Sequence, residues 1–289
     1  MSEHDKDIDT ETGVETTGHE WDGIKELNNP LPRWWLWTFY LCILWGVWYV
    51  IAYPAWPMIK GATEGYLGYS TRANVEADIN AFNDKNADLR AALTEVDLTK
   101  LEEDEALSRF AVAGGAAVFR TNCSQCHGSG AAGAKGYPNL LDDDWLWGGT
   151  IEEIAYTINH GIRNEIDPDA RWTEMPAFGE ILEKDQISQV VQHVISLSST
   201  EFDTAMAAEG AVIFDEQCSA CHAVDGAGDR AIGAPNLTDA IWLYGGDEQT
   251  LTETITYSRF GVMPPWGPRL SQSDVNAVAA YVHQLGGGE

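Results

Sequence analysis

The sequence predicts an all-α protein in which a single N-terminal transmembrane helix is followed by two helical domains in tandem. Three observations lead to this fold class. One uncharged run of about twenty residues lies near the N-terminus, the chain repeats itself after residue 106, and neither repeat shows the apolar–polar alternation that is typical of strands. With 289 residues, the chain has room for two domains besides the membrane segment.

The composition limits the partners that the protein can have. Its 45 acidic and 17 basic residues give a formal charge of −28, with an isoelectric point near 4.3. A field of this sign repels phosphate backbones, so the composition excludes nucleic acid and favours cationic partners. The five cysteines are too few for a disulfide scaffold of this size.

Residues 1–32 form a polar segment with nine acidic residues against Lys6 and Lys25, which predicts a solvated tail. Residues 33–54 form the predicted transmembrane helix, because the uncharged run over 34–53 is about 30 Å long as a helix, the thickness of a hydrocarbon core. Tryptophans and tyrosines at both ends match interfacial belts. A signal peptide would begin basic and have a shorter apolar run, so we expect an uncleaved anchor in membrane lipid. Lys25 and Arg33 favour a cytoplasmic N-terminus.

Residues 55–105 connect the anchor to the repeats. Apolar residues at helical spacing predict a helix over 71–93 that is broken at Asn86. These residues are Val75, Ile79, Phe82, Leu89 and Leu93.

The two repeats occupy residues 106–200 and 201–289. Gly115 and Gly210 each stand eight residues before a cysteine, and each repeat continues with Pro-Asn-Leu, with a Trp-Leu-Trp/Tyr-Gly-Gly segment and with one Met-Pro pair. Each repeat then closes with an amphipathic helical pattern. We therefore expect two domains of the same kind.

Each repeat contains one CxxCH motif. The first consists of Cys123, Cys126 and His127, and the second of Cys218, Cys221 and His222. Two thiols at this spacing can add to the vinyl groups of one haem, and the adjacent histidine can reach its iron. A redox dithiol needs no following histidine, and a zinc site needs no methionine downstream. The motifs therefore predict two covalently attached c-type haems.

Met175 and Met263 are the expected second axial ligands of the two irons. Each begins a Met-Pro loop downstream of a motif, and a thioether opposite an imidazole raises the potential and closes the coordination sphere. This is typical of an electron carrier. Each methionine could serve the haem of its own repeat or that of the other repeat, and the spacing leaves both arrangements open. For His160, His193 and His283 we expect packing, helix-end or surface roles, since none corresponds to a histidine in the other repeat.

These motifs carry a resemblance. The repeats resemble class I cytochrome c domains, and the whole chain resembles the membrane-anchored dihaem subunit, subunit III, of the cbb3-type cytochrome c oxidases. Outside the CxxCH domains the resemblance lies in two segments, TGHEWDGI at residues 17–24 and NNPLPRWW at residues 28–35. It covers essentially the full length, and some assignments in that family exchange the two methionines between the haems.

The resemblance implies a single-pass protein of the bacterial inner membrane, with a cytoplasmic tail and periplasmic haem domains. Such a subunit passes electrons from a periplasmic cytochrome c to the catalytic haem-copper subunit that reduces oxygen, beside a monohaem cytochrome c subunit. It has no catalytic site of its own. Two rival functions are a freestanding membrane-anchored dihaem carrier and a dihaem peroxidase, which would need one open iron.

The charge of the repeats predicts the electron donor. Residues 106–289 hold 25 acidic and 9 basic side chains, among them Asp142, Asp143 and Asp144 in a row. We therefore expect a soluble or tethered cytochrome c with a cationic docking face.

Overall fold

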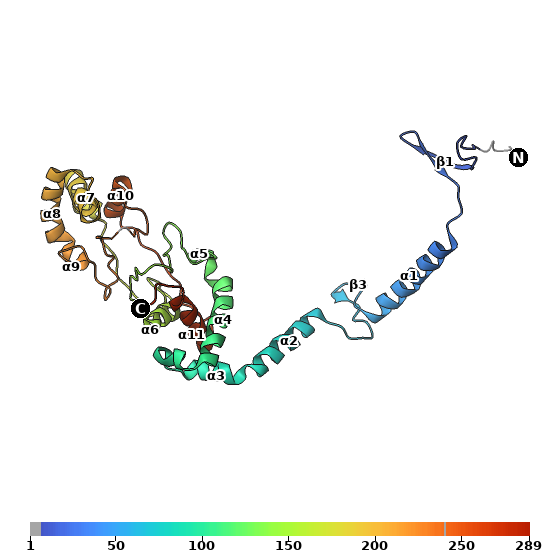
Figure 1. The fold of residues 1–289 in the computed structure, drawn as a ribbon, viewed down its shortest axis with the longest axis horizontal. Helices are drawn as coiled ribbons and strands as arrows, with labels where there is room; N and C mark the ends of the chain where they lie inside the picture. Colours follow the sequence, from blue (N-terminus) through green and yellow to red (C-terminus); the bar gives the residue numbers. More distant parts are fainter. Residues whose placement is uncertain (1–6, 240) are drawn as a thin grey trace. The chain divides into compact units, whose positions relative to one another are not determined.

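The computed structural model describes residues 7–239 and 241–289, and its chain divides into two compact units, residues 1–83 and 84–289 (Figure 1). Each unit is described by itself. The described part of the chain is mainly helical, as predicted, and contains one helix long and apolar enough to span a membrane.

The N-terminal segment is not only a solvated tail. Strand β1 (Thr16–Trp21) pairs antiparallel with β2 (Ile24–Leu27) around a two-residue turn at Asp22 and Gly23. Both turn residues have positive φ, 50° and 83°, which Asp-Gly tolerates well in hairpins. The sequence signal was the pair Asp22-Gly23 between two short runs. Residues 1–6 of the predicted tail lie outside the described residues.

Helix α1 (Arg33–Ala52) is the candidate membrane span, and only Ala52 of its residues is buried. After it, β3 (Pro57–Met58) and β4 (Gly61–Ala62) form a short hairpin. The chain then returns to the helix end, where the backbone N–H groups of Tyr66 and Leu67 donate to Ile51 and Ala52. Gly65, with φ of 71°, permits this return because a Cβ there would lie 2.3 Å from the Ala52 carbonyl oxygen.

The connecting region contains two helices separated at Asn86, as the spacing predicted. Helix α2 (Thr71–Lys85) is followed by α3 (Ala87–Glu95) and by the 3₁₀ helix η1 (Leu98–Glu103). Leu93 and Leu101 are buried with Leu107 and Ala277, so α3 and η1 belong to the core of the second unit. Asn276 fixes this packing by donating from its side chain to the Leu93 carbonyl, at 2.8 Å.

The second unit is built from the helices of the two repeats. They are α4 (Glu105–Asn122), α5 (Ser124–His127), α6 (Ile151–His160), η2 (Phe178–Glu180), α7 (Lys184–Ser198), α8 (Thr204–Gln217), α9 (Ser219–His222), α10 (Glu248–Tyr257) and α11 (Gln272–His283).

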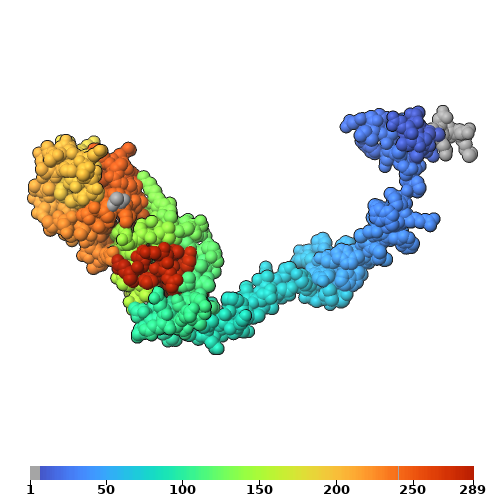
Figure 2. Space-filling model, viewed as in Figure 1, coloured from blue at the N-terminus to red at the C-terminus, as the bar shows by residue number. Residues whose placement is uncertain are grey.

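These helices pack across the repeats. Helix α4 of the first repeat packs on α11 of the second, and α8 of the second repeat packs on α7 of the first. Figure 2 shows the C-terminal residues in red among the green residues of the first repeat. The closing helix of each repeat therefore completes the core of the other repeat.

One glycine makes each of these helix crossings possible. A Cβ on Gly115 would come within 2.0 Å of the Ala277 carbonyl oxygen, and a Cβ on Gly210 within 2.0 Å of the Gln189 carbonyl oxygen. The backbones can therefore touch only because both positions lack a side chain. The glycine that recurs eight residues before each motif is thus the point of closest approach of two helices: Gly115 for α4 and α11, and Gly210 for α8 and α7.

Two of the buried cores of the described residues adjoin the CxxCH motifs. The first lies among α4, α6 and α11 and contains Phe119, Ile154, Ile158, Val275 and Val278. The second contains Phe178, Val190, Phe214, Leu251 and Ile255, all from the continuous segment 175–258. That segment is inserted in the chain between the two halves of the first core.

Candidate functional site

Each CxxCH motif forms one short helical turn at the end of a longer helix. Helices α4 and α8 end immediately before Cys123 and Cys218, and the motif turns α5 and α9 follow directly. The first cysteine of each motif is half-buried and packs against a core, whereas Cys126 and Cys221 are exposed. One flank of each motif therefore faces apolar side chains and the other remains open.

The motif histidines are held in one tautomer. Nδ1 of His127 lies 3.1 Å from the Pro138 carbonyl oxygen, and Nδ1 of His222 lies 3.1 Å from that of Pro235. Because a carbonyl only accepts, Nδ1 must carry the proton, which leaves Nε2 with a free lone pair. Burial lowers the pKa of both histidines, and the bond to the proline carbonyl opposes this shift. A neutral imidazole with a free Nε2 is the form that binds a metal.

The first cysteines are not those of a redox dithiol. Burial, and to a smaller degree the neighbouring thiol, raises the pKa of Cys123 and of Cys218 to about 11. Reactive dithiols have a lowered pKa, since the thiolate is the nucleophile. The raised pKa of Cys123 and Cys218 therefore argues against a redox dithiol at either motif.

The two methionines lie in the cores of opposite repeats. Met263, from the second repeat, packs against the core that contains Cys123, and Met175, from the first, packs against the core that contains Cys218. Both side chains are half-buried. Of the two arrangements left open by the spacing, this packing favours the exchanged one.

Backbone contacts hold the methionine loops in these exchanged positions. Ile162 and Met263 exchange two backbone hydrogen bonds of 2.9 Å, and the Ser258 hydroxyl donates to the Met175 carbonyl. Arg163 ties the two loops together, because its guanidinium donates to the carbonyl of Thr173 at 2.6 Å and to that of Gly261 at 3.0 Å. The methionine loops are therefore fixed by several independent contacts.

A buried indole supports the fit of a haem in this unit. The Nε1 of Trp147 is buried without a hydrogen-bond partner among the residues that the structure describes. A buried donor of this kind costs about 1–3 kcal/mol unless something accepts its hydrogen bond. A haem carries carboxylates that can accept such a bond, so the orphaned donor fits a porphyrin beside it. Together with the free Nε2 atoms and the thioethers, the donor set suits c-type haems.

The segments after the motifs contact each other reciprocally. The Trp147 ring lies against Gly233, where a Cβ would come within 2.3 Å of ring carbons, and Tyr244 lies against Gly136, with a corresponding distance of 3.3 Å. The backbone N–H of Gly136 also donates to the Leu243 carbonyl, at 2.9 Å. The Trp-Leu-Trp/Tyr-Gly-Gly repeat therefore joins the two haem regions.

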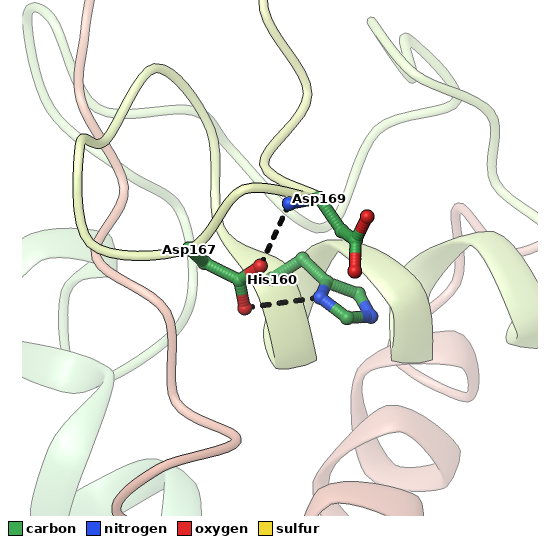
Figure 3. Close-up of side chains that lie close together, drawn as sticks. All are labelled: His160, Asp167 and Asp169. Atoms are coloured by element: carbon green, nitrogen blue, oxygen red, sulfur yellow. Dashed lines mark hydrogen bonds and ion pairs between the residues drawn. The ribbon is translucent and has the colours of Figure 1, made fainter.

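His160 takes part in a loop contact (Figure 3). Its Nδ1 lies 3.0 Å from the Asp167 carboxylate, whose other oxygen accepts from the Asp169 backbone N–H at 2.8 Å. Nε2 lies 3.0 Å from the Asn159 amide nitrogen, and the ring packs on Tyr156. With both nitrogens engaged, His160 shapes the loop that leads from α6 toward Met175.

The other histidines and the arginines also have protein contacts. His193 packs on Phe214, and Nε2 of His283 lies 2.9 Å from the Glu289 carbonyl oxygen. Arg171 donates to the Trp147 carbonyl, and Arg259 donates to the Thr250 carbonyl at 2.9 Å. The two arginines therefore stabilise the segments around the cores through hydrogen bonds to backbone carbonyls.

Sequence reasoning did not find three of these features: the proline carbonyls that orient the histidines, the buried Trp147 donor and the Arg163 clamp. The first two left a signal, because Pro-Asn-Leu and Trp-Leu-Trp/Tyr recur after each motif. The Arg163 clamp left none, since its partners come from two distant loops.

Two helical cores, each with a CxxCH turn and a methionine loop, define tandem c-type cytochrome domains, and α1 is a candidate membrane anchor. Comparison with known families agrees. The family model described as "Cytochrome C oxidase, cbb3-type, subunit III" matches residues 110–194 and 205–282, and that of the "N-terminal domain of cytochrome oxidase-cbb3, FixP" matches residues 13–60. The chain belongs to the family of cbb3-type cytochrome c oxidase subunits named CcoP or FixP.

Relatives match over nearly the full chain. A CcoP subunit of Cereibacter sphaeroides is 61% identical over 276 residues, which cover 95% of both chains. A CcoP subunit of Rhodobacter capsulatus is 53% identical, with 97% of this chain and 98% of the relative covered. A FixP subunit of Sinorhizobium medicae is 49% identical, with full coverage of both chains.

Proposed function

We propose that the chain carries two covalently attached c-type haems and passes electrons through them from a periplasmic cytochrome c to the oxygen-reducing subunit of a cbb3-type oxidase. The observation that carries this proposal is the packing of one methionine against the core of each CxxCH motif. When bound, each haem supplies an iron that takes up and releases one electron. The residues around each haem attach it, hold its iron and fix its position.

In this proposal Cys123 and Cys126 attach the first haem, and His127 with Met263 holds its iron. Cys218 and Cys221 attach the second, and His222 with Met175 holds its iron. The exchange of methionines is supported by the Ile162–Met263 backbone pair and by the Ser258–Met175 contact. His127 and His222 keep a fixed tautomer through the proline carbonyls, so little rearrangement accompanies a change of iron charge.

The two methionines argue against a dihaem peroxidase. A dihaem peroxidase needs an open or displaceable iron position, and here a thioether is available in each core. A freestanding dihaem carrier would have the same motifs, so the motifs alone do not distinguish it from a subunit of an oxidase. Membership of the oxidase subunit family favours the assembly, and we assign no catalytic site to this chain.

The topology in this proposal has the N-terminus in the cytoplasm, α1 in the lipid of the bacterial inner membrane and the haem domains in the periplasm. Attachment of c-type haems outside the cytoplasm supports this orientation. The partners are the catalytic haem-copper subunit, the monohaem cytochrome c subunit and a soluble or tethered cationic cytochrome c as donor.

Haem quantification tests the core of the proposal. A pyridine haemochrome assay of the purified full chain is expected to give two c-type haems per chain. The variant with Cys123→Ala and Cys126→Ala is expected to give one, and the variant with Cys218→Ala and Cys221→Ala likewise one. A single haem in the unmutated protein, or no loss in either variant, would contradict the proposal.

A further inference from the structure

We infer that the β1–β2 hairpin is a docking element for a Lys/Arg-bearing cytoplasmic loop of a membrane-spanning partner subunit. The inference rests on the proposed function for the orientation of the chain and for its assembly with an oxidase. It concerns a segment that plays no part in holding the haems.

The hairpin lacks a core of its own. It is a two-stranded sheet in which Thr16 is the only buried residue. An isolated two-stranded hairpin is marginally stable in water, because it buries too little apolar surface to offset the ordering of its backbone. A surface that covers one face of the hairpin would supply the missing burial.

One face of the hairpin has the composition of a binding surface. Trp21 and Ile24 are cross-strand partners beside the turn, and 62% and 75% of their surfaces are exposed. Side chains alternate between the two faces of a strand, so His19 lies on the same face as Trp21, and their rings are 5.6 Å apart. A tryptophan beside an aliphatic residue, surrounded by polar groups, is the usual centre of a protein interface.

The charge of this region selects the partner. Residues 1–32 carry nine acidic and two basic residues, and Glu20, Asp22 and Glu26 lie in or beside the hairpin turn and strands. An anionic lipid surface repels such a segment. The cytoplasmic loops of membrane proteins, by contrast, carry an excess of lysine and arginine. A basic loop is therefore complementary to the hairpin, whereas lipid headgroups are not.

The length of the chain keeps the hairpin near such loops. Only residues 28–32 separate β2 from the start of α1, and five extended residues reach about 20 Å at most. Two of these residues are prolines, which stiffen the link. The N-terminal family model also spans residues 13–60, so it includes the hairpin together with the membrane helix.

Site-specific photo-cross-linking in native membranes tests the docking. With p-benzoylphenylalanine at Ile24, we expect a cross-link to a Lys/Arg-containing loop of a membrane-spanning subunit of the oxidase, identified by peptide mass spectrometry. The matched control carries the probe at Glu20, on the opposite face, and is expected to give at least fivefold less of this product. Cross-links from Ile24 to phospholipid, to soluble proteins or to this chain itself would overturn the inference, as would equal yields from both faces.

Two sets of variants test the energetics. Trp21→Ala with Ile24→Ser is expected to lower the recovery of the catalytic subunit with this chain at least tenfold, at unchanged haem content. Val212→Ser, an exposed apolar position on α8, is its control. Glu26→Lys, two residues beyond Ile24 and on the same face of β2, is expected to release the partner at lower salt, whereas Glu102→Lys is not. Unchanged recovery and unchanged salt dependence in both hairpin variants would contradict the docking.

Labelling of an introduced cysteine from each side of the membrane distinguishes a failure of the docking from a failure of the proposed orientation. In a Thr12→Cys chain, an impermeant maleimide is expected to label the hairpin region only after the cytoplasmic face is opened. Labelling from the periplasm would refute the proposed orientation and the docking together. Cytoplasmic labelling without the Ile24 cross-link would refute the docking alone.

Discussion

Ile162 of the first repeat and Met263 of the second exchange two backbone hydrogen bonds, each 2.9 Å between nitrogen and oxygen. This pair fixes the second methionine loop beside the first CxxCH core. On the other side of the unit, Ser258 of the second repeat donates to the carbonyl of Met175 from the first. The exchange of closing helices and the exchange of methionine loops are thus one structural feature. The segment 175–258 builds the second core and is inserted in the chain between the two halves of the first core.

The exchanged ligation can be tested in a chain with one haem. In the Cys123→Ala and Cys126→Ala background the remaining haem sits at Cys218 and Cys221, and we expect Met175→His to lower its midpoint potential by on the order of 0.1 V, because imidazole stabilises Fe(III) more than a thioether does. In that background Met263→His is the matched control, with no expected shift. A redox titration that shows the opposite pattern would establish that each repeat binds its own methionine.

The glycine at the first helix crossing predicts a steric effect on stability. Gly115→Ala would bring a Cβ within 2.0 Å of the Ala277 carbonyl oxygen, so α4 and α11 must move apart, at a cost of about 1–3 kcal/mol. Gly114→Ala on the same helix has its nearest neighbour at 4.0 Å and is expected to be neutral or slightly stabilising. Thermal unfolding of the haem-loaded proteins compares them, and equal melting temperatures would mean that the crossing is less close than described.

Asp144 predicts a pH-dependent stability. Burial raises the pKa of the Asp144 carboxyl to about 6, and the neighbouring carboxylates of Asp239, Asp142 and Asp143 add to this shift. The Arg230 guanidinium opposes it. Since the unfolded pKa is near 3.8, the folded state prefers the protonated acid, so this contribution to stability is complete below about pH 4 and is lost as the pH rises through 6.

We therefore expect Asp144→Asn to raise the melting temperature at pH 7, by on the order of 2–4 °C, and to make no difference at pH 4. Melting curves of the holoprotein in a pH series measure this effect. Asp215→Asn, at an exposed position on α8 that is not among the groups acting on Asp144, is the control and is expected to follow the unmutated protein throughout. A melting temperature of Asp144→Asn that falls at pH 7 would show that the ionised carboxylate is stabilising.

The acidic surface predicts a salt-dependent reaction with the donor. Changing Asp142, Asp143 and Asp144 together to Asn is expected to slow bimolecular reduction by a cationic cytochrome c several-fold at low salt, with the midpoint potentials nearly unchanged. Stopped-flow measurements between about 0.01 and 1 M ionic strength should show the difference disappear as the Debye length falls from about 30 to 3 Å. The control is the variant with Gln at Glu102, Glu103 and Glu105, which has the same change of charge elsewhere on the chain. If the reduction rate is independent of salt in the unmutated protein and in both variants, the acidic residues serve solubility and not docking.

Local features of the sequence determined much of this protein. The uncharged run over 34–53 predicted a helix long and apolar enough to span a membrane, and Asn86 separated α2 from α3. The CxxCH turns at Cys123 and Cys218 follow from spacing within a few residues. The β1–β2 hairpin was missed although Asp22-Gly23 is a strong turn signal, because the surrounding charges masked the short strands.

The partner of each closing helix was decided only by the tertiary structure. Both α7 and α11 present an apolar face of the same kind, and both α4 and α8 offer a glycine that permits a close crossing, so the helical periodicity fits either pairing. Contacts between residues far apart, such as Ile162 with Met263 and Asn276 with Leu93, select one pairing. Periodicity specifies which face of a helix is buried, whereas the choice between two equivalent partners depends on loop lengths and on hydrogen bonds that form only when distant segments meet.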